Sequence, residues 1–183
     1  RPLIPLFGVN MCPGVASEVA DVLVSGQIAE GPKVKLFEEA IGCFFDLHKV
    51  NRVAVTVNSG TTAIELALIL AGVGRGDDVL TTPMTCTATT TAIINRGARP
   101  VWVDVDEEGN LDPDDIHRRW TPQTKAVVVV EWGGRSLDLG AIRNAMPRAV
   151  ALIEDAAHAF TFNRYSMADF RCFSFQAIKH LTT

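Results

Sequence analysis

The sequence predicts an α/β fold, a three-layer sandwich in which a mostly parallel central sheet lies between layers of helices. Short β-branched, apolar runs alternate with longer stretches whose apolar residues recur at helical spacing, and this alternation is typical of a parallel sheet. One run, 126–130, is continuously apolar, as expected for a strand covered on both faces. No linker or internal repeat divides the 183 residues, which indicates one domain.

The individual elements are predicted from apolar periodicity and from the residues at their ends. Pro13 and Pro32 stand where a first helical residue is expected, and Gly72 follows the last periodic residue of another helix. We expect helices at 13–24, 31–45, 63–71, 86–95, 113–119 and 139–146. We expect strands at 52–57, 78–82, 99–104, 126–130, 149–153 and 170–175, the first of them buried.

Composition and charge exclude several classes of protein. Hydrophobic residues make up 48% of the chain, enough to form a core, and a formal net charge of −4 does not suit a nucleic-acid binder. No apolar stretch reaches about 18 residues, so no membrane-spanning helix is expected, and the N-terminus lacks a signal-peptide pattern. The cysteines show no metal-ligand spacing, which predicts no metal site and favours a cytoplasmic protein with ordinary buried thiols: Cys12, Cys43, Cys86 and Cys172.

Polar segments follow three of the predicted strands, at the sheet edge where ligands bind in open α/β folds. The first segment, 58–62 (NSGTT), joins a strand to a helix, and its small and hydroxylated residues suit an anion such as phosphate at the helix N-terminus. It has the spacing of neither a Walker loop nor a dinucleotide-binding motif. The alternative is an ordinary helix cap that uses Ser or Thr.

The other two segments supply a carboxylate and an amine. In 153–159 (IEDAAHA), an apolar strand leads into Asp155 and His158, and a buried carboxylate at that place needs a cationic partner. The alternative is a capping acid with a core histidine. In 172–180, Lys179 follows an aromatic strand and is suited to form a Schiff base, although a solvated lysine is the alternative.

Taken together, the three segments fit one ligand, pyridoxal 5'-phosphate. This cofactor needs its phosphate held, its ring nitrogen protonated opposite a carboxylate, and its aldehyde joined to a lysine. Segment 58–62 and Ser174 would serve the phosphate, Asp155 the ring nitrogen and Lys179 the aldehyde.

At these residues the sequence resembles the DegT-type family of nucleotide-sugar aminotransferases, which are fold-type I pyridoxal-phosphate enzymes. The resemblance covers nearly the whole chain and includes 57–63 (VNSGTTA); its specific motifs are 153–159 (IEDAAHA) and 173–179 (FSFQAIK). It implies that residues 1–183 are a partial, truncated large domain of the PLP-transferase type, with the small C-terminal domain absent. It also implies a longer, glycine-containing hairpin where this chain has the short stretch 160–168.

The resemblance implies a role for each candidate residue. Lys179 would be the Schiff-base lysine and proton shuttle, Asp155 would pair with the ring nitrogen, and His158 would lie near the ring; these three are the predicted catalytic residues. Many relatives place an aromatic residue over the ring, and the matching position here is expected to hold Thr87. The predicted cofactor-binding residues are Ser59, Gly60, Thr61, Thr87, Asp155, His158, Ser174, Gln176 and Lys179.

The implied reaction is transfer of an amino group from a donor such as glutamate to a keto sugar of a nucleotide sugar. A related subgroup dehydrates sugars and carries histidine in place of the lysine, so Lys179 favours transamination. The alternatives are a dehydratase or lyase of the same fold, and an inactive fragment or scaffold. Relatives are homodimers with shared active sites, and segment 26–31 resembles one that reaches the shared site.

Overall fold

Among the residues that the structure describes, five strands form one sheet, all parallel, in the order β2-β1-β3-β4-β5. The computed structural model describes residues 3–5, 8–160 and 166–182. Continuous apolar composition allows β3 to occupy the centre of the sheet, where Val127 pairs with Leu80 on one side and Leu152 on the other. The strands are β1 (Asp78–Thr81), β2 (Arg99–Trp102), β3 (Thr124–Val130), β4 (Ala151–Asp155) and β5 (Phe170–Cys172).

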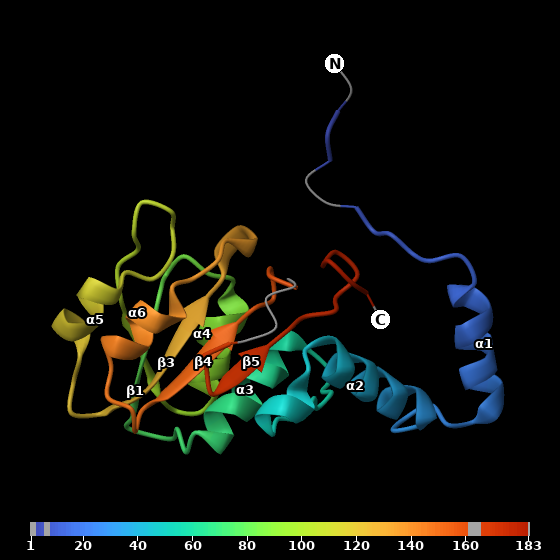
Figure 1. The fold of residues 1–183 in the computed structure, drawn as a ribbon, viewed down its shortest axis with the longest axis horizontal. Coiled ribbons are helices and arrows are strands. Elements are labelled where there is room, and N and C mark those ends of the chain that lie inside the picture. Colours follow the sequence, from blue (N-terminus) through green and yellow to red (C-terminus); the bar gives the residue numbers. More distant parts are fainter. Residues whose placement is uncertain (1–2, 6–7, 161–165, 183) are drawn as a thin grey trace.

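Helices cover both faces of this sheet, which confirms the predicted three-layer fold (Figure 1). On one face, α3 (Gly60–Leu70) and α4 (Thr87–Asn95) pack Leu68 and Ile93 against buried strand residues such as Val128. On the other face, α5 (Pro113–Arg119) and α6 (Leu139–Asn144) contribute Ile116 and Ile142 to a second buried cluster. Burial of these apolar surfaces is the main favourable contribution to folding.

Two α-helices precede α3 in the chain. They are α1 (Val15–Ser25) and α2 (Pro32–Phe44), with Pro32 in the first turn as expected. No residue of α1 is buried, and the helix lies apart from the sheet (Figure 1). Two short 3-10 helices, η1 (Leu47–Val50) and η2 (Trp132–Gly134), follow α2 and β3. The expected hairpin around 160–168 includes residues outside the described ranges.

The predicted buried strand at 52–57 is wrong. The segment belongs to no strand, and the side chains of Val53 and Val55 are 81% and 65% exposed. Its polar contacts include Glu38 of α2, which accepts hydrogen bonds from the N–H and the hydroxyl of Thr56, and the carbonyl oxygen of Ala168, which accepts one from the guanidinium of Arg52. A β-branched pattern indicates an extended backbone, but a strand also needs a neighbouring strand to pair with. Segment 52–57 has no such neighbour in the described sheet, since β5, at the sheet edge, pairs with β4.

Burial of the cysteines was also predicted incorrectly. Cys172 on β5 is buried, whereas the thiols of Cys12, Cys43 and Cys86 are exposed and unpaired. Burial raises the pKa of the Cys172 thiol to about 12, so this cysteine is neutral at physiological pH.

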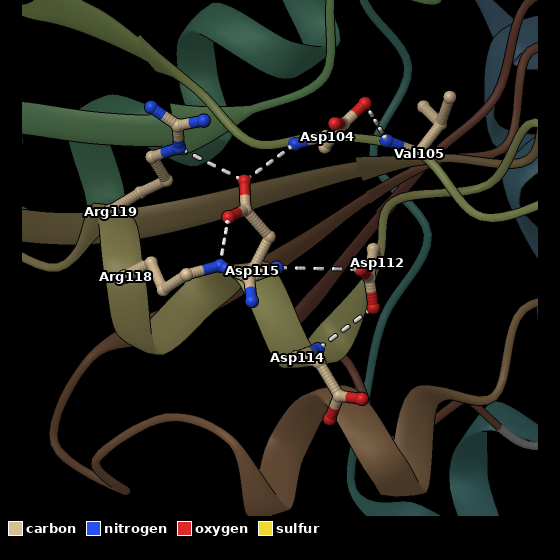
Figure 2. Close-up of polar contacts among 7 residues, drawn as sticks. All are labelled: Asp104, Val105, Asp112, Asp114, Asp115, Arg118 and Arg119. Atoms are coloured by element: carbon tan, nitrogen blue, oxygen red, sulfur yellow. Dashed lines mark hydrogen bonds and ion pairs between the residues drawn. The ribbon is translucent and has the colours of Figure 1, made fainter.

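A buried carboxylate joins α5 to the loop that follows β2 (Figure 2). Asp115 accepts hydrogen bonds from the Nε of Arg118 at 2.7 Å, the Nε of Arg119 at 2.9 Å and the N–H of Asp104 at 2.9 Å. The hydrogen bond from Arg118 is the largest cause that lowers the pKa of Asp115 well below its ordinary value. Asp115 therefore stays ionised in the folded protein at pH values where an unfolded aspartate is protonated.

We expect Asp115→Asn to lower the free energy of unfolding at pH 7 by about 1–2 kcal/mol, because charge-assisted hydrogen bonds are lost while both arginines remain solvated. The folded-state pKa of Asp115 is lowered, so its contribution is present above the unfolded pKa of about 3.9 and is lost as the pH falls below it. Urea unfolding at pH 7 and pH 3 measures this. The difference from wild type should shrink at pH 3, whereas Asp114→Asn on the same helix should change little at either pH.

Candidate active site

A cavity of about 1410 Å³ lies beside the carboxyl ends of β4 and β5 and the N-terminus of α3. Eight of the nine residues predicted to bind the cofactor line it, although they come from three separate segments of the chain. Parallel strands bring those segments together because their carboxyl ends meet at one edge of the sheet. These residues are Ser59, Gly60, Thr61, Asp155, His158, Ser174, Gln176 and Lys179.

The ninth residue, Thr87, does not line the cavity. Its side chain is exposed, whereas the neighbouring Cys86 and Ala88 are cavity residues. The reason is local: Cys86 is the N-cap of α4 and Thr87 its first residue, and successive helical residues point about 100° apart. Cys86, and not Thr87, is therefore the candidate neighbour of a bound ring.

The N-terminus of α3 presents backbone donors to the cavity. Ser59 is its N-cap, and its hydroxyl oxygen accepts a hydrogen bond from the N–H of Thr62 at 3.1 Å. This side chain therefore forms the ordinary helix cap that the sequence offered as the alternative to an anion site. The first N–H groups of a helix have no intrahelical acceptor, and here they belong to the cavity residues Gly60 and Thr61. Together with the helix dipole, they can bind an anion.

Gly60 allows the start of α3 to lie against the segment that follows β5. A Cβ atom at this position would lie 3.1 Å from the Cβ of Ser174 and 3.3 Å from the carbonyl oxygen of Phe173. The same close approach places the hydroxyl of Ser174 beside the helix N-terminus, and that hydroxyl also accepts from the N–H of Gln176 at 3.5 Å. The serine can therefore add a hydroxyl donor to the anion site.

Asp155 is the last residue of β4, and only 5% of its surface is exposed. Its Oδ2 accepts a hydrogen bond from the hydroxyl of Thr89 at 2.7 Å, and its Oδ1 accepts one from the N–H of Ala157 at 3.2 Å. Burial raises the pKa of Asp155, while these hydrogen bonds and the nearby charges of His158 and Lys179 oppose that rise. A cationic ligand group in the cavity would stabilise the ionised form further.

His158 is held by the turn that follows β3. Its Nδ1 accepts a hydrogen bond from the N–H of Gly133 at 3.4 Å, and its ring lies 5.3 Å from that of Trp132. Burial, and then the charge of Lys179, lowers the pKa of His158, so the ring is neutral near pH 7 and carries its proton on Nε2. Gly134 is required there, since φ is 78° and a Cβ would lie 2.7 Å from the carbonyl oxygen of His158.

Lys179 lies in a turn just beyond β5 and is half-buried. Its backbone N–H donates to the carbonyl oxygen of Gln176 at 2.8 Å, which closes the turn and directs the chain along the cavity. Its positive charge favours the ionised form of Asp155 and disfavours the protonated form of His158. The cavity thus combines an anion site, an oriented carboxylate and a primary amine.

Sequence reasoning missed two contributors to this site. Thr89 holds Asp155 from α4, and Trp132 lines the cavity beside His158. The paired glycines after Trp132 were a usable signal of a tight turn, whereas nothing distinguishes Thr89 from the other threonines of 87–91.

The fold and the site define a cofactor-binding α/β domain of the aminotransferase type, and sequence comparison identifies the family. Residues 14–183 match the DegT/DnrJ/EryC1/StrS aminotransferase family, and the chain belongs to it. It is 42% identical over 188 residues to the spore coat polysaccharide biosynthesis protein SpsC of Bacillus subtilis (strain 168), covering 98% of this chain and 46% of that protein.

Solved structures show the same similarity. Spr1654 from Streptococcus pneumoniae, in its PMP form, superposes with a TM-score of 0.89 at 30% identity, covering 98% of this chain and 50% of that one. The sugar aminotransferase CalS13 from Micromonospora echinospora superposes with a TM-score of 0.79 at 39% identity, covering 86% and 44%. The chain therefore spans about half the length of these relatives. In the part of the chain that the structure describes, no helix is long and apolar enough to cross a membrane.

Proposed function

We propose that the protein containing this chain transfers an amino group from a donor such as glutamate to a keto sugar of a nucleotide sugar, with pyridoxal 5'-phosphate as cofactor. The observation that carries this proposal is the convergence of Asp155, Lys179 and the N-terminus of α3 on one cavity. Membership of the aminotransferase family supports it, as do the PLP and PMP forms of Spr1654.

The residues present fit this cofactor. Gly60 leaves room for a close approach at the N-terminus of α3, and Asp155 is a buried carboxylate whose Oδ1 has acceptor capacity beyond its bond from Ala157. The N–H groups of Gly60 and Thr61, with the hydroxyl of Ser174, would hold the phosphate. Asp155 would accept the N–H of the protonated pyridine ring, and such a charged pair contributes about 1.5–3 kcal/mol.

When bound, the cofactor supplies an electron sink for the charge that develops as a proton leaves the substrate carbon. Lys179 would hold the aldehyde carbon before substrate enters, and its released amine would then move the proton as a general base and acid. His158 would donate a hydrogen bond from Nε2 toward the ring, since its Nδ1 is already engaged by Gly133. Residues outside this chain would complete the closure of the site.

A lysine at position 179 favours amino transfer over the dehydration that a related subgroup performs with histidine. His180 is adjacent but is out of register with the lysine position: the N–H that closes the turn with Gln176 belongs to Lys179, and His180 is the next residue. As the alternative, the isolated chain is an inactive part of such an enzyme, because it spans about half the length of its relatives.

The proposal includes the partners and location of the protein. The chain would be the cofactor-binding part of a large domain, and the protein would be a homodimer in which segment 26–31 reaches a shared site. The exposed apolar residues of α1, Val19, Leu23 and Val24, are compatible with such a contact. The unpaired cysteines are compatible with the reducing environment of the cytoplasm.

Addition of pyridoxal 5'-phosphate to the full-length protein should produce a visible absorbance band that borohydride abolishes, with the added mass found on the Lys179 peptide. Glutamate should convert the cofactor to its amino form, and a nucleotide keto sugar should then restore the original band. Dimeric sedimentation at micromolar concentration is expected for the same sample. Absence of the reducible band would contradict cofactor binding, and a band that no keto sugar restores would contradict the proposed acceptor.

A further inference from the structure

A short chain of hydroxyl groups links the carboxylate of Asp155 to the segment that follows β1. The Oγ1 of Thr89 lies 2.7 Å from the Oδ2 of Asp155, and the Oγ1 of Thr85 lies 2.7 Å from that of Thr89. Thr89 is fully buried on α4, 66 residues away from Asp155 in the sequence. The contact therefore joins the loop and helix after β1 to the end of β4.

The donor directions in this chain follow from the number of hydrogens available. An ionised carboxylate only accepts hydrogen bonds, so Thr89 donates its single hydroxyl hydrogen to Asp155. The oxygen of Thr89 is then left as an acceptor, and the hydroxyl of Thr85 must be the donor across their 2.7 Å contact. Each hydroxyl polarises the next, which strengthens the bond to the carboxylate.

Thr89 also determines which oxygen of Asp155 is available to a ligand. Oδ2 is directed to Thr89, while Oδ1 accepts only from the N–H of Ala157, at the longer distance of 3.2 Å, among the described contacts. Rotation of the carboxylate would break both bonds in a site where an unpaired polar group is costly. The carboxylate is thus oriented before any ligand binds.

We propose that Thr89, supported by Thr85, is a positioning residue that holds the carboxylate of Asp155 with Oδ1 presented to the cofactor ring. The inference rests on the proposed function for the identity of that ring, but the hydroxyl chain itself belongs to the protein without ligand. It assigns a role to a threonine that contacts neither substrate nor the reacting atoms.

Titration of Asp155 by carbon-detected NMR, in full-length protein without cofactor, tests the proposal directly. Thr89→Val keeps the shape of the side chain and removes the hydroxyl that stabilises the ionised carboxylate. We expect the proton dissociation constant of Asp155 to fall about tenfold, which is what loss of a charge-assisted hydrogen bond implies. The other ionisable groups that face Asp155 are His158, Lys179 and Cys172, and their titrations are followed in the same samples.

Two variants control for packing. Thr89→Ser keeps the hydroxyl and should restore most of the wild-type value, whereas Thr91→Val, on the exposed side of the same helix, should leave it unchanged. Should Thr89→Val fail to fold, Thr85→Val removes only the supporting donor and should shift the titration in the same direction by less. An Asp155 titration that neither Thr89→Val nor Thr85→Val alters would overturn the proposal.

Binding of pyridoxal 5'-phosphate provides the second measurement. Thr89→Val should raise the dissociation constant about tenfold, by the same lost hydrogen bond, with Thr89→Ser close to wild type. The two readouts separate the hypotheses. An altered Asp155 titration with no cofactor binding by any variant would contradict the proposed function alone, while unaltered titration with normal binding would contradict the role of Thr89 alone.

Discussion

Lys179→Ala is expected to abolish covalent attachment of pyridoxal 5'-phosphate and to reduce amino transfer by at least about 10³-fold, since general acid–base catalysis by one group contributes about 10²–10⁴-fold. In the proposed function the amine of Lys179 has two roles. It would bond to the aldehyde, and it would move the proton at the substrate carbon. Asp155 and the N-terminus of α3 remain in place, so the variant should still bind the cofactor noncovalently.

The effect should be chemical and not structural. Lys179 is half-buried in a turn that its backbone N–H closes with Gln176, and that bond survives the substitution. Thermal unfolding of the apo protein should therefore be close to wild type. Lys35→Ala, at an exposed position on α2, should leave both the borohydride-reducible band and the activity unchanged. A reducible band in Lys179→Ala would assign the attachment to another amine.

The accuracy of the sequence predictions depends on how local the determining interactions are. Helix α5 runs over Pro113–Arg119 as expected, because Asp112 caps it and Pro113 opens it. The segment 52–57 has equally clear β-branched character, but its assignment required knowledge of a partner strand that no local pattern contains. Similarly, β4 extends to Asp155, since backbone pairing with β3 continues through Glu154 despite the change to polar side chains.

The site residues, like the helices and strands, were predicted well where local sequence determines their position and missed where a distant contact does. Asp155 ends β4, and His158 and Lys179 lie beyond the carboxyl ends of β4 and β5, so their convergence could be deduced from the parallel order of the strands. Thr89 acts through a contact with Asp155 across 66 residues of sequence, and Trp132 through its ring contact with His158 on a different segment. Thr87 was matched to the ring-facing position of relatives, and the match is displaced by one residue because the cavity is lined by Cys86, the N-cap of α4.

Beneath the site, the ends of β3, β4 and β5 hold a buried group of charges. In the parallel register, Val129 lies beside Glu154 and Glu154 beside Arg171, which places these residues on the sheet face away from Asp155. Arg171 makes ion pairs with Glu154 at 2.8 Å and with Glu131 at 3.5 Å. Its guanidinium also lies over the ring of Phe173, 5.0 Å from the centroid.

The surroundings of Glu131 favour its protonated form. Burial, and then the charge of Glu154, raises the pKa of Glu131 to about 8, while Arg171 opposes that rise. A carboxyl with a raised folded-state pKa binds its proton more tightly when folded. Its contribution therefore weakens stability as the pH rises from about 4.5 toward that value.

We expect Arg171→Met to lower the free energy of unfolding at pH 7 by about 3–5 kcal/mol, the usual cost of removing one partner from a buried ion pair. Methionine fills a similar volume, so the loss reflects buried acidic groups left without their cation and not a cavity. Chemical denaturation measures it, with the exposed Arg148→Met as the matched control.

The added variant Glu131→Gln distinguishes charge from packing as the origin of that loss. In the Arg171→Met background it removes one of the two facing carboxylates, so it should recover part of the lost stability and flatten the decline between pH 4.5 and 8. If the double variant is no more stable than Arg171→Met at pH 8, electrostatic repulsion is not the cause. The contacts of the Arg171 side chain with Phe45 and Phe173 would then account for its contribution.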